Sequence, residues 1–76
     1  MKVLEGRYRH PIRGDGMTLA VFQREGGYLA MESRDGAVTV FATLGLFDSR
    51  EGALGRVAAR GQELERQGYQ EAAGVQ

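Results

Sequence analysis

The chain contains one histidine, His10, which is the first residue to consider for acid–base chemistry. On a strand, His10 and Tyr8 would share one face, because alternate side chains point the same way. A general base also needs an orienting acid and a pocket, and the acid that folding would most readily supply is Glu32. No spacing in the sequence ties these residues together, so we expect His10 to be solvated beside a proline turn. The sequence therefore predicts no catalytic residue and no enzyme activity.

Metal and cofactor sites lack the residue sets that they require. The sequence has no cysteine and only one histidine, whereas a zinc site needs three or four ligands at characteristic spacings. The segment Gly14-Asp15-Gly16 lacks the Lys-Ser/Thr pair of a P-loop and does not join a strand to a helix, as a dinucleotide fingerprint does. It is typical of a hairpin turn. We expect neither a metal nor a cofactor.

A basic cluster near the start of the chain is the one group suited to nucleic-acid binding. The first 13 residues carry four basic side chains against one acidic side chain, Glu5, giving a net charge of +3 in a chain that is neutral overall. Basic residues interleaved with an aromatic residue suit phosphate contact and base stacking. On a strand, however, the arginines at 7 and 9 face away from Tyr8. The four candidate contacts are Lys2, Arg7, Arg9 and Arg13.

Zero net charge argues against a protein devoted to coating nucleic acid or an anionic membrane. Weak nucleic-acid binding through the basic cluster is therefore the alternative function. Arg56 and Arg60, one helical turn apart, could add a second basic spot. Glu63 lies within reach of both, so we expect these side chains to be paired on the surface.

Size and composition limit the chain to one small domain. A chain of 76 residues buries only about 60% of the surface that its unfolded form exposes. Without cysteine it has no disulfides, so its stability rests on packing or on a partner. The first ten residues lack a signal-peptide pattern, and no apolar run is long enough to span a membrane. We expect a cytoplasmic protein with one domain over residues 1–70 and a frayed tail over 71–76.

Four short runs, separated by glycine-rich turns, have the composition of strands. The turns Glu25-Gly26-Gly27 and Asp35-Gly36 are typical of hairpins, so the last three runs should form an antiparallel meander. The first run, residues 3–12, alternates less regularly. Pro11 cannot donate to a ladder, so this strand should lie at an edge or end by His10. The three regular runs are residues 17–23, 28–33 and 37–44.

The segment after the strands is expected to be one amphipathic helix over residues 49–67. Asp48 is the predicted N-cap, with Glu51 three residues later completing a variant of the capping box. Gly68 can take the left-handed position after the last turn, which brings Tyr69 against Leu64 in a Schellman cap. The apolar residues of this helix recur at steps of three and four and share one face. They are Ala53, Leu54, Val57, Ala58, Gly61 and Leu64.

One helix can cover only one face of the predicted sheet. If Leu29 and Met31 point toward the helix, then Tyr28 and Ala30 point away, and Phe22 or Phe41 joins them according to register. An uncovered face with several apolar residues is typical of dimers and ligand surfaces. Scattered apolar residues that long side chains shield need no partner, which is the simpler alternative.

The sequence thus favours an α+β domain of order ββββα or βββα, with an antiparallel sheet and one C-terminal helix. The function that we expect is interaction or assembly without catalysis. The partner would be a second copy, paired through edge strands or the second sheet face, or another protein. We expect no membrane partner and no metal.

The segment from Gly45 to Leu54, GLFDSREGAL, resembles the sheet-to-helix junction of small uncharacterised bacterial proteins. In these proteins a meander is followed by a phenylalanine, a cap and one long helix, and no activity is attached to them. Together with Gly68-Tyr69, the segment is also similar to the tail of the WGR domain, a module associated with nucleic-acid-processing proteins. The Trp-Gly-Arg core of that domain is absent, since the chain has no tryptophan. The resemblance implies the order of the elements.

Overall fold

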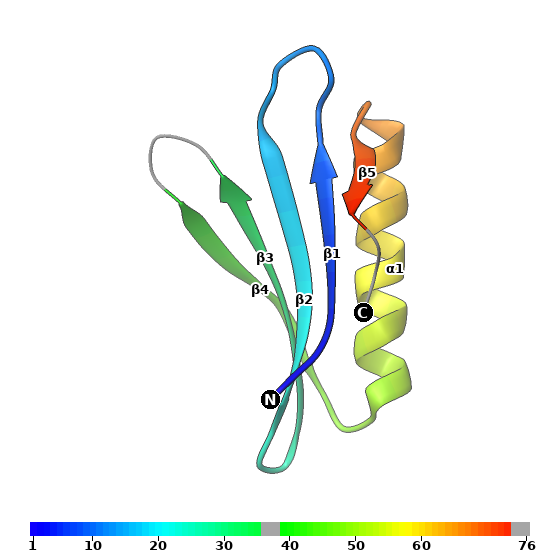
Figure 1. Ribbon diagram of the computed structural model, residues 1–76. Coiled ribbons are helices and arrows are strands. Elements are labelled where there is room, and N and C mark those ends of the chain that lie inside the picture. Colours follow the sequence, from blue (N-terminus) through cyan, green and yellow to red (C-terminus); the bar gives the residue numbers. More distant parts are fainter. Residues whose placement is uncertain (36–38, 74–76) are drawn as a thin grey trace.

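A computed structural model of the protein describes residues 1–35 and 39–73. It shows one antiparallel sheet with a single helix packed along one face (Figure 1). The strands lie in the order β4-β3-β2-β1-β5, which confirms the α+β class and the ββββα order and adds a short strand at the end. The elements are β1 (Lys2–Arg9), β2 (Gly16–Arg24), β3 (Gly27–Asp35), β4 (Val40–Phe47), α1 (Arg50–Arg66) and β5 (Gln70–Ala73).

The first three strands lie close to where the sequence predicts them. β2 and β3 are joined by a two-residue turn in which Gly26 has φ of 85°, and Arg24 pairs with Gly27 across it. β1 ends at Arg9, before Pro11, as the missing proline donor requires. Its other edge is covered at one end by β5, because Arg7, Tyr8 and Arg9 pair with residues of that strand.

β4 differs from its predicted span, because it begins at Val40 rather than at residue 37 and continues to Phe47. The cause is a β-bulge. Gly45 lies opposite Ala30 and Thr43 lies opposite Met31, so Leu44 is an extra residue in the ladder. A bulge interrupts the alternation of side chains between the two faces of the sheet. A prediction that depends on this alternation therefore ends the strand at Leu44. Part of the predicted run (residues 37 and 38) and Gly36 of the predicted Asp35-Gly36 turn lie outside the described residues.

The start of α1 corrects the predicted capping box. Ser49, not Asp48, is the N-cap, with extended backbone angles (φ −124°, ψ 152°), and its Oγ accepts the N–H of Gly52 at 3.1 Å. A serine in this place satisfies one of the N–H groups that the first turn leaves without a partner. Since the helix begins at Arg50, Glu51 lies one position too early for the predicted box.

The end of α1 is the predicted Schellman cap. Gly68 has φ of 100°, and its N–H donates to the carbonyl of Glu65 at 3.0 Å. The N–H of Tyr69 donates to the carbonyl of Leu64, also at 3.0 Å. The side chains of Leu64 and Tyr69 are both buried, as the hydrophobic contact of this motif requires. The cap therefore turns the chain back toward the sheet and starts β5.

The tail expected to fray after Tyr69 instead continues into β5. Gln70, Glu71 and Ala73 pair antiparallel with Arg9, Tyr8 and Arg7 of β1. Backbone pairing, rather than burial of apolar side chains, orders this segment. The pattern of apolar residues in the sequence therefore does not predict the strand. Residues 74–76 lie outside the described part of the chain.

The core lies between α1 and the facing side of β2 and β3. From the helix it takes Ala53, Val57, Gly61 and Leu64, as predicted, whereas Leu54 is half-buried and Ala58 is exposed. The strand register shows which residues of β3 face the helix. Tyr28 and Ala30 lie opposite Gln23 and Val21 and face the helix, so Leu29 and Met31 point away from it. The sheet residues buried against the helix are Met17, Leu19, Val21 and Ala30.

Two glycines of α1 should respond differently to replacement by alanine. Gly55 is exposed, and a Cβ built there meets nothing within 4 Å, so Gly55→Ala should raise the free energy of unfolding by about 1 kcal/mol through helix propensity. At Gly61 a Cβ would lie 2.5 Å from the Tyr8 hydroxyl oxygen and 3.3 Å from Cζ. The displaced Tyr8 ring should cancel the same gain. Urea denaturation of both variants checks this, and equal stabilisation would contradict the close packing of Tyr8.

Candidate interaction surface

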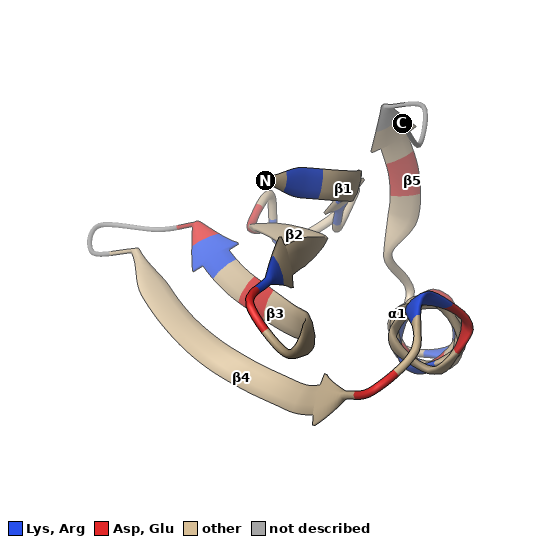
Figure 2. Cartoon of the chain, turned by 90° about the horizontal axis from the view of Figure 1, so that it is seen from below, with Lys and Arg blue, Asp and Glu red and all other residues tan. Residues whose placement is uncertain are grey.

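β4 is an edge strand without a charged residue. Its eight residues, VFATLGLF, lie at the outer end of the sheet order, and Figure 2 shows the strand uncharged along its length where it curves past β3. Val40, Phe41 and Leu46 are 59%, 69% and 76% exposed. Natural sheets usually protect such edges with charge, proline or short length. β4 lacks charge and proline and is eight residues long. Its one feature that can protect an edge is the bulge at Leu44, so the edge on either side of that bulge is suited to pairing with another strand.

The sheet face beside this edge, turned away from α1, is also apolar. Leu29 lies between Phe22 and Leu46 in the ladder, and Met31 is the next residue of β3 on the same face. Phe22, Met31 and Phe41 line a shallow hollow of about 260 Å³ on this face. We call the edge of β4 together with this apolar half of the open face the β4 surface. Its large side chains are Phe22, Leu29, Met31, Phe41 and Leu46.

The other half of the open face is polar and internally paired. Lys2 Nζ lies 2.6 Å from one carboxylate oxygen of Glu5, and Arg7 Nε lies 3.1 Å from the other. The hydrogen bond from Lys2 lowers the pKa of Glu5 below its ordinary value, and Arg7 adds to the effect. Arg9 Nη1 donates to the carbonyl of Gly14 at 3.1 Å. This ion-paired strip borders the β4 surface on the side of β1.

The predicted basic cluster is therefore divided by the fold. Arg7 and Arg9 share the open face, as their alternation predicts, whereas Arg13 lies in the β1–β2 turn beside Tyr69. On the helix, Arg56 and Arg60 lie 3.7 Å and 3.9 Å from Glu63, which confirms the expected pairing. Each of these cations has an acceptor or an ion-pair partner within the chain.

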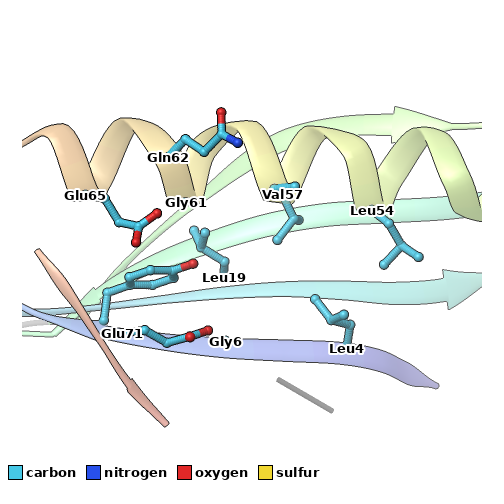
Figure 3. A pocket seen from close by; sticks show the side chains of 11 residues that line it. Leu4, Gly6, Leu19, Leu54, Val57, Gly61, Gln62, Glu65 and Glu71 are labelled. Atoms are coloured by element: carbon cyan, nitrogen blue, oxygen red, sulfur yellow. The ribbon is translucent and has the colours of Figure 1, made fainter. Parts of the chain in front are cut away.

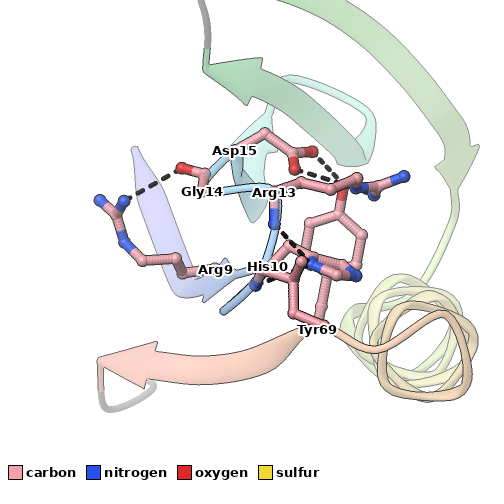
Figure 4. Close-up of polar contacts among 7 residues, drawn as sticks. Arg9, His10, Arg13, Gly14, Asp15 and Tyr69 are labelled. Carbon is pink, nitrogen blue, oxygen red and sulfur yellow. Dashed lines mark hydrogen bonds and ion pairs between the residues drawn. The ribbon is translucent and has the colours of Figure 1, made fainter.

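A polar cluster in the β1–β2 turn closes over Tyr69 (Figure 4). The Tyr69 hydroxyl donates to Asp15 Oδ2 and accepts from Arg13 Nη2 at 2.9 Å. The Arg13 guanidinium also lies 5.4 Å from the centre of the Tyr69 ring. The imidazole of His10 meets that ring edge-on at 5.3 Å, and its Nδ1 accepts the N–H groups of Ile12 and Arg13. The sequence shows no sign of this cluster, since its parts are more than 50 residues apart.

These contacts shift two titrating groups in opposite directions. The hydrogen bond from Tyr69 lowers the pKa of the Asp15 carboxyl, with help from the nearby charge of Arg13. The same bond raises the pKa of the Tyr69 phenol, and burial raises it further. Asp15 Oδ1 is buried without a hydrogen bond, and Arg13 Nε, 3.3 Å away, compensates it by charge alone. The cluster fastens the β1–β2 turn to the end of α1.

The residues considered for catalysis do not form one site. Glu32 accepts from Arg60 Nε at 2.7 Å, and this bond raises the pKa of Arg60. His10 contacts Tyr69 instead, and its Nδ1 is already taken by two backbone donors. Over the described ranges, no three His, Cys, Asp or Glu side chains are grouped so that they could hold a metal ion.

Removal of the Tyr69 hydroxyl should change the response to acid. Because the pKa of Asp15 is lower in the folded state than in the unfolded state, the stability that this carboxylate contributes is present above its unfolded pKa, near 3.9, and is lost as pH falls below it. Tyr69→Phe removes the main cause of the shift. The stability difference between wild type and Tyr69→Phe should therefore be largest at pH 7 and shrink toward pH 3.

Urea denaturation at several pH values measures this difference. Tyr28→Phe is the control, because the Tyr28 hydroxyl makes no hydrogen bond with any described residue. A difference between wild type and Tyr69→Phe that stays constant from pH 7 to pH 3 would show that Asp15 does not titrate through this bond.

No family model, curated protein or solved structure matches this chain. Within residues 1–35 and 39–73, no helix is long and apolar enough to cross a membrane. The protein is a small antiparallel sheet with one helix on one face and a short final strand.

Proposed function

We propose that this protein is a small assembly module without catalytic activity, and that it binds a second copy of itself through the β4 surface. The observation that carries the proposal is the eight-residue uncharged edge strand, which continues into the apolar half of the open sheet face. Long apolar edges without charge are the usual templates for strand pairing between chains. A strand of a second copy would satisfy the outer backbone groups of β4.

A second copy fits this surface better than an unrelated charged partner. Antiparallel pairing of β4 with its own copy creates a two-fold interface, in which the same patch serves both partners. Since β4 carries no charge, such pairing places no like charges opposite each other. The whole chain has a net charge of zero, so long-range repulsion does not oppose the approach of two copies.

The open face of the sheet must contribute buried area to the proposed dimer interface, in addition to the edge of β4. A typical stable interface removes about 800 Å² from each partner, roughly one sixth of the 4969 Å² surface of the described chain. A single strand edge does not supply that area. Phe41 and Leu46 are exposed on the same strand and stand on the open face, so pairing of β4 brings their copies together and adds apolar burial to the backbone hydrogen bonds.

The oligomeric state in solution tests the proposal. Sedimentation at micromolar concentrations should give twice the 8.3 kDa mass of the chain for wild type. Phe41→Lys and Leu46→Lys, made separately, should each give a monomer with an unchanged circular dichroism spectrum, because each would bury an ammonium group without a partner in the apolar interface. Ile12→Lys, at an 89% exposed position in the β1–β2 turn, is the matched control and should remain a dimer. A wild-type protein that sediments as a monomer would refute the proposal.

Nucleic-acid binding through Lys2, Arg7, Arg9 and Arg13 is the second candidate. The favouring observation is that Arg7 and Arg9 line a polar hollow of about 510 Å³ on the open face. It has less support, because the partners of these side chains lie within the chain. Single- and double-stranded oligonucleotides at low salt test it. Saturable binding lost in the double variant Arg7→Ala, Arg9→Ala would favour this function, and absence of binding would end it.

A further inference from the structure

A second apolar hollow lies between α1 and β1, on the face of the sheet opposite to the hollow described above. Its volume is about 350 Å³, within the size range of sites for small ligands. Leu19, which is fully buried, and Val57 form its floor and one wall. Figure 3 shows Leu4 and Leu54 at one end of the hollow, both half-buried and projecting from opposite sides. We call this hollow the helix groove.

The helix groove is shaped by small residues beside a large one. Gly6 and Gly61 stand in its lining, where any larger residue would narrow the space between strand and helix. The Tyr8 ring packs against Gly61 so closely that an added Cβ would lie 2.5 Å from its hydroxyl oxygen. Tyr8 thereby holds its hydroxyl in the groove, beside Gly61.

The far end of the helix groove is acidic. Glu65 of α1 and Glu71 of β5 both line it at the end away from Leu4 and Leu54 (Figure 3). No lysine, arginine or histidine belongs to the lining, and neither carboxylate forms an ion pair with a described residue. Burial raises the pKa of the Tyr8 phenol, and the charges of Glu71 and Glu65 raise it further. The negative charges of both carboxylates are therefore felt at the Tyr8 hydroxyl, inside the groove.

We propose that the helix groove binds a small primary amine with an apolar tail. The tail would lie along Leu19 and Val57 toward Leu4 and Leu54, which form the apolar end. The ammonium group, with three donors, would lie near the Glu65 and Glu71 carboxylates and the Tyr8 hydroxyl oxygen, all of which can accept. A carboxylate ligand of the same length would meet two like charges, and a neutral alcohol would gain no ion pair.

Octylamine, octanoate and octanol test this assignment, because they share one tail and differ in head group. Binding to the wild-type protein is followed by NMR through the methyl signals of Leu4, Leu19, Leu54 and Val57. We expect octylamine to shift these signals at saturation and to bind about tenfold more tightly than octanol, as two partly exposed ion pairs imply. Octanoate should bind more weakly than octanol. Shifts that spread over the β4 surface instead would place the site elsewhere.

The double variant Glu65→Gln, Glu71→Gln should bring octylamine to the affinity of octanol while leaving octanol binding unchanged. Glu25→Gln, Glu51→Gln is the matched control, since it removes the same charge from two exposed positions outside the groove. That control should keep the full preference for the amine. Equal binding of all three ligands, no binding, or an equal loss in the control would overturn the proposal.

Discussion

Replacement of Leu64 by alanine is expected to lower the free energy of unfolding by about 2 to 5 kcal/mol. Leu64 is only 1% exposed and belongs to the core between α1 and the sheet. Its side chain also forms the hydrophobic contact of the Schellman cap with Tyr69. A domain of this size has roughly 4 to 11 kcal/mol in total, so the variant should be partly unfolded at room temperature or close to it.

Urea denaturation at a fixed protein concentration measures the effect of Leu64→Ala, because self-association would add to the apparent stability. Ile12→Ala is the control, at an 89% exposed position, and should change the free energy of unfolding by less than about 0.5 kcal/mol. A loss of less than 1 kcal/mol for Leu64→Ala would mean that the helix does not pack on the sheet through this residue.

Replacement of Gly27 by alanine should cost about 3 kcal/mol, at the upper end for overpacked sites. A Cβ at this position would lie 2.5 Å from the carbonyl oxygen of Phe47. That oxygen belongs to the backbone, so it cannot rotate away as a side chain would. The β3 and β4 backbones must separate there, at the point where β4 leads into α1.

Gly26→Ala is the matched control for Gly27→Ala, because it lies one residue away, in the β2–β3 turn, and both glycines have positive φ (85° and 159°). Gly26 has φ of 85°, and a Cβ there meets nothing within 4 Å, so its cost is conformational and should be about 1 kcal/mol. Thermal or urea denaturation of both variants measures the difference. If Gly26→Ala cost as much as Gly27→Ala, backbone conformation rather than the close approach of Phe47 would explain the requirement for glycine.

Local signals in the sequence predict most of this fold. The Glu25-Gly26 turn, the end of β1 before Pro11 and the Schellman cap at Gly68 each depend on residues within a few positions of one another. The sequence predicts the N-cap at Asp48 rather than Ser49, because both residue types can cap and the sequence does not fix which one precedes the first turn. The bulge at Leu44 depends on the partner strand β3, which no window of β4 alone contains.

The sites are harder to predict than the fold, because their parts come from distant segments. The absence of charge in VFATLGLF is readable from the sequence, but its meaning depends on β4 being at the edge. The contacts of Arg13 and Asp15 with Tyr69 join residues 54 to 56 positions apart. The helix groove combines β1, α1 and β5, and the sequence predicts no strand at β5.

The pairing of β1 with β5 has a consequence for the order of folding. Arg7 pairs with Ala73, so the first and last strands of the sheet meet only after almost the whole described chain has been made. During synthesis the β2–β3 hairpin can form early, because its residues are neighbours in the sequence. The edge of β1 that pairs with β5 stays open until β5 has been made. Closing so long a loop is slow in comparison with local contacts. A nascent chain halted before Gln70 should thus expose the β1 edge at Arg7, Tyr8 and Arg9 to chaperones, and β5 covers that part of the edge once it is made.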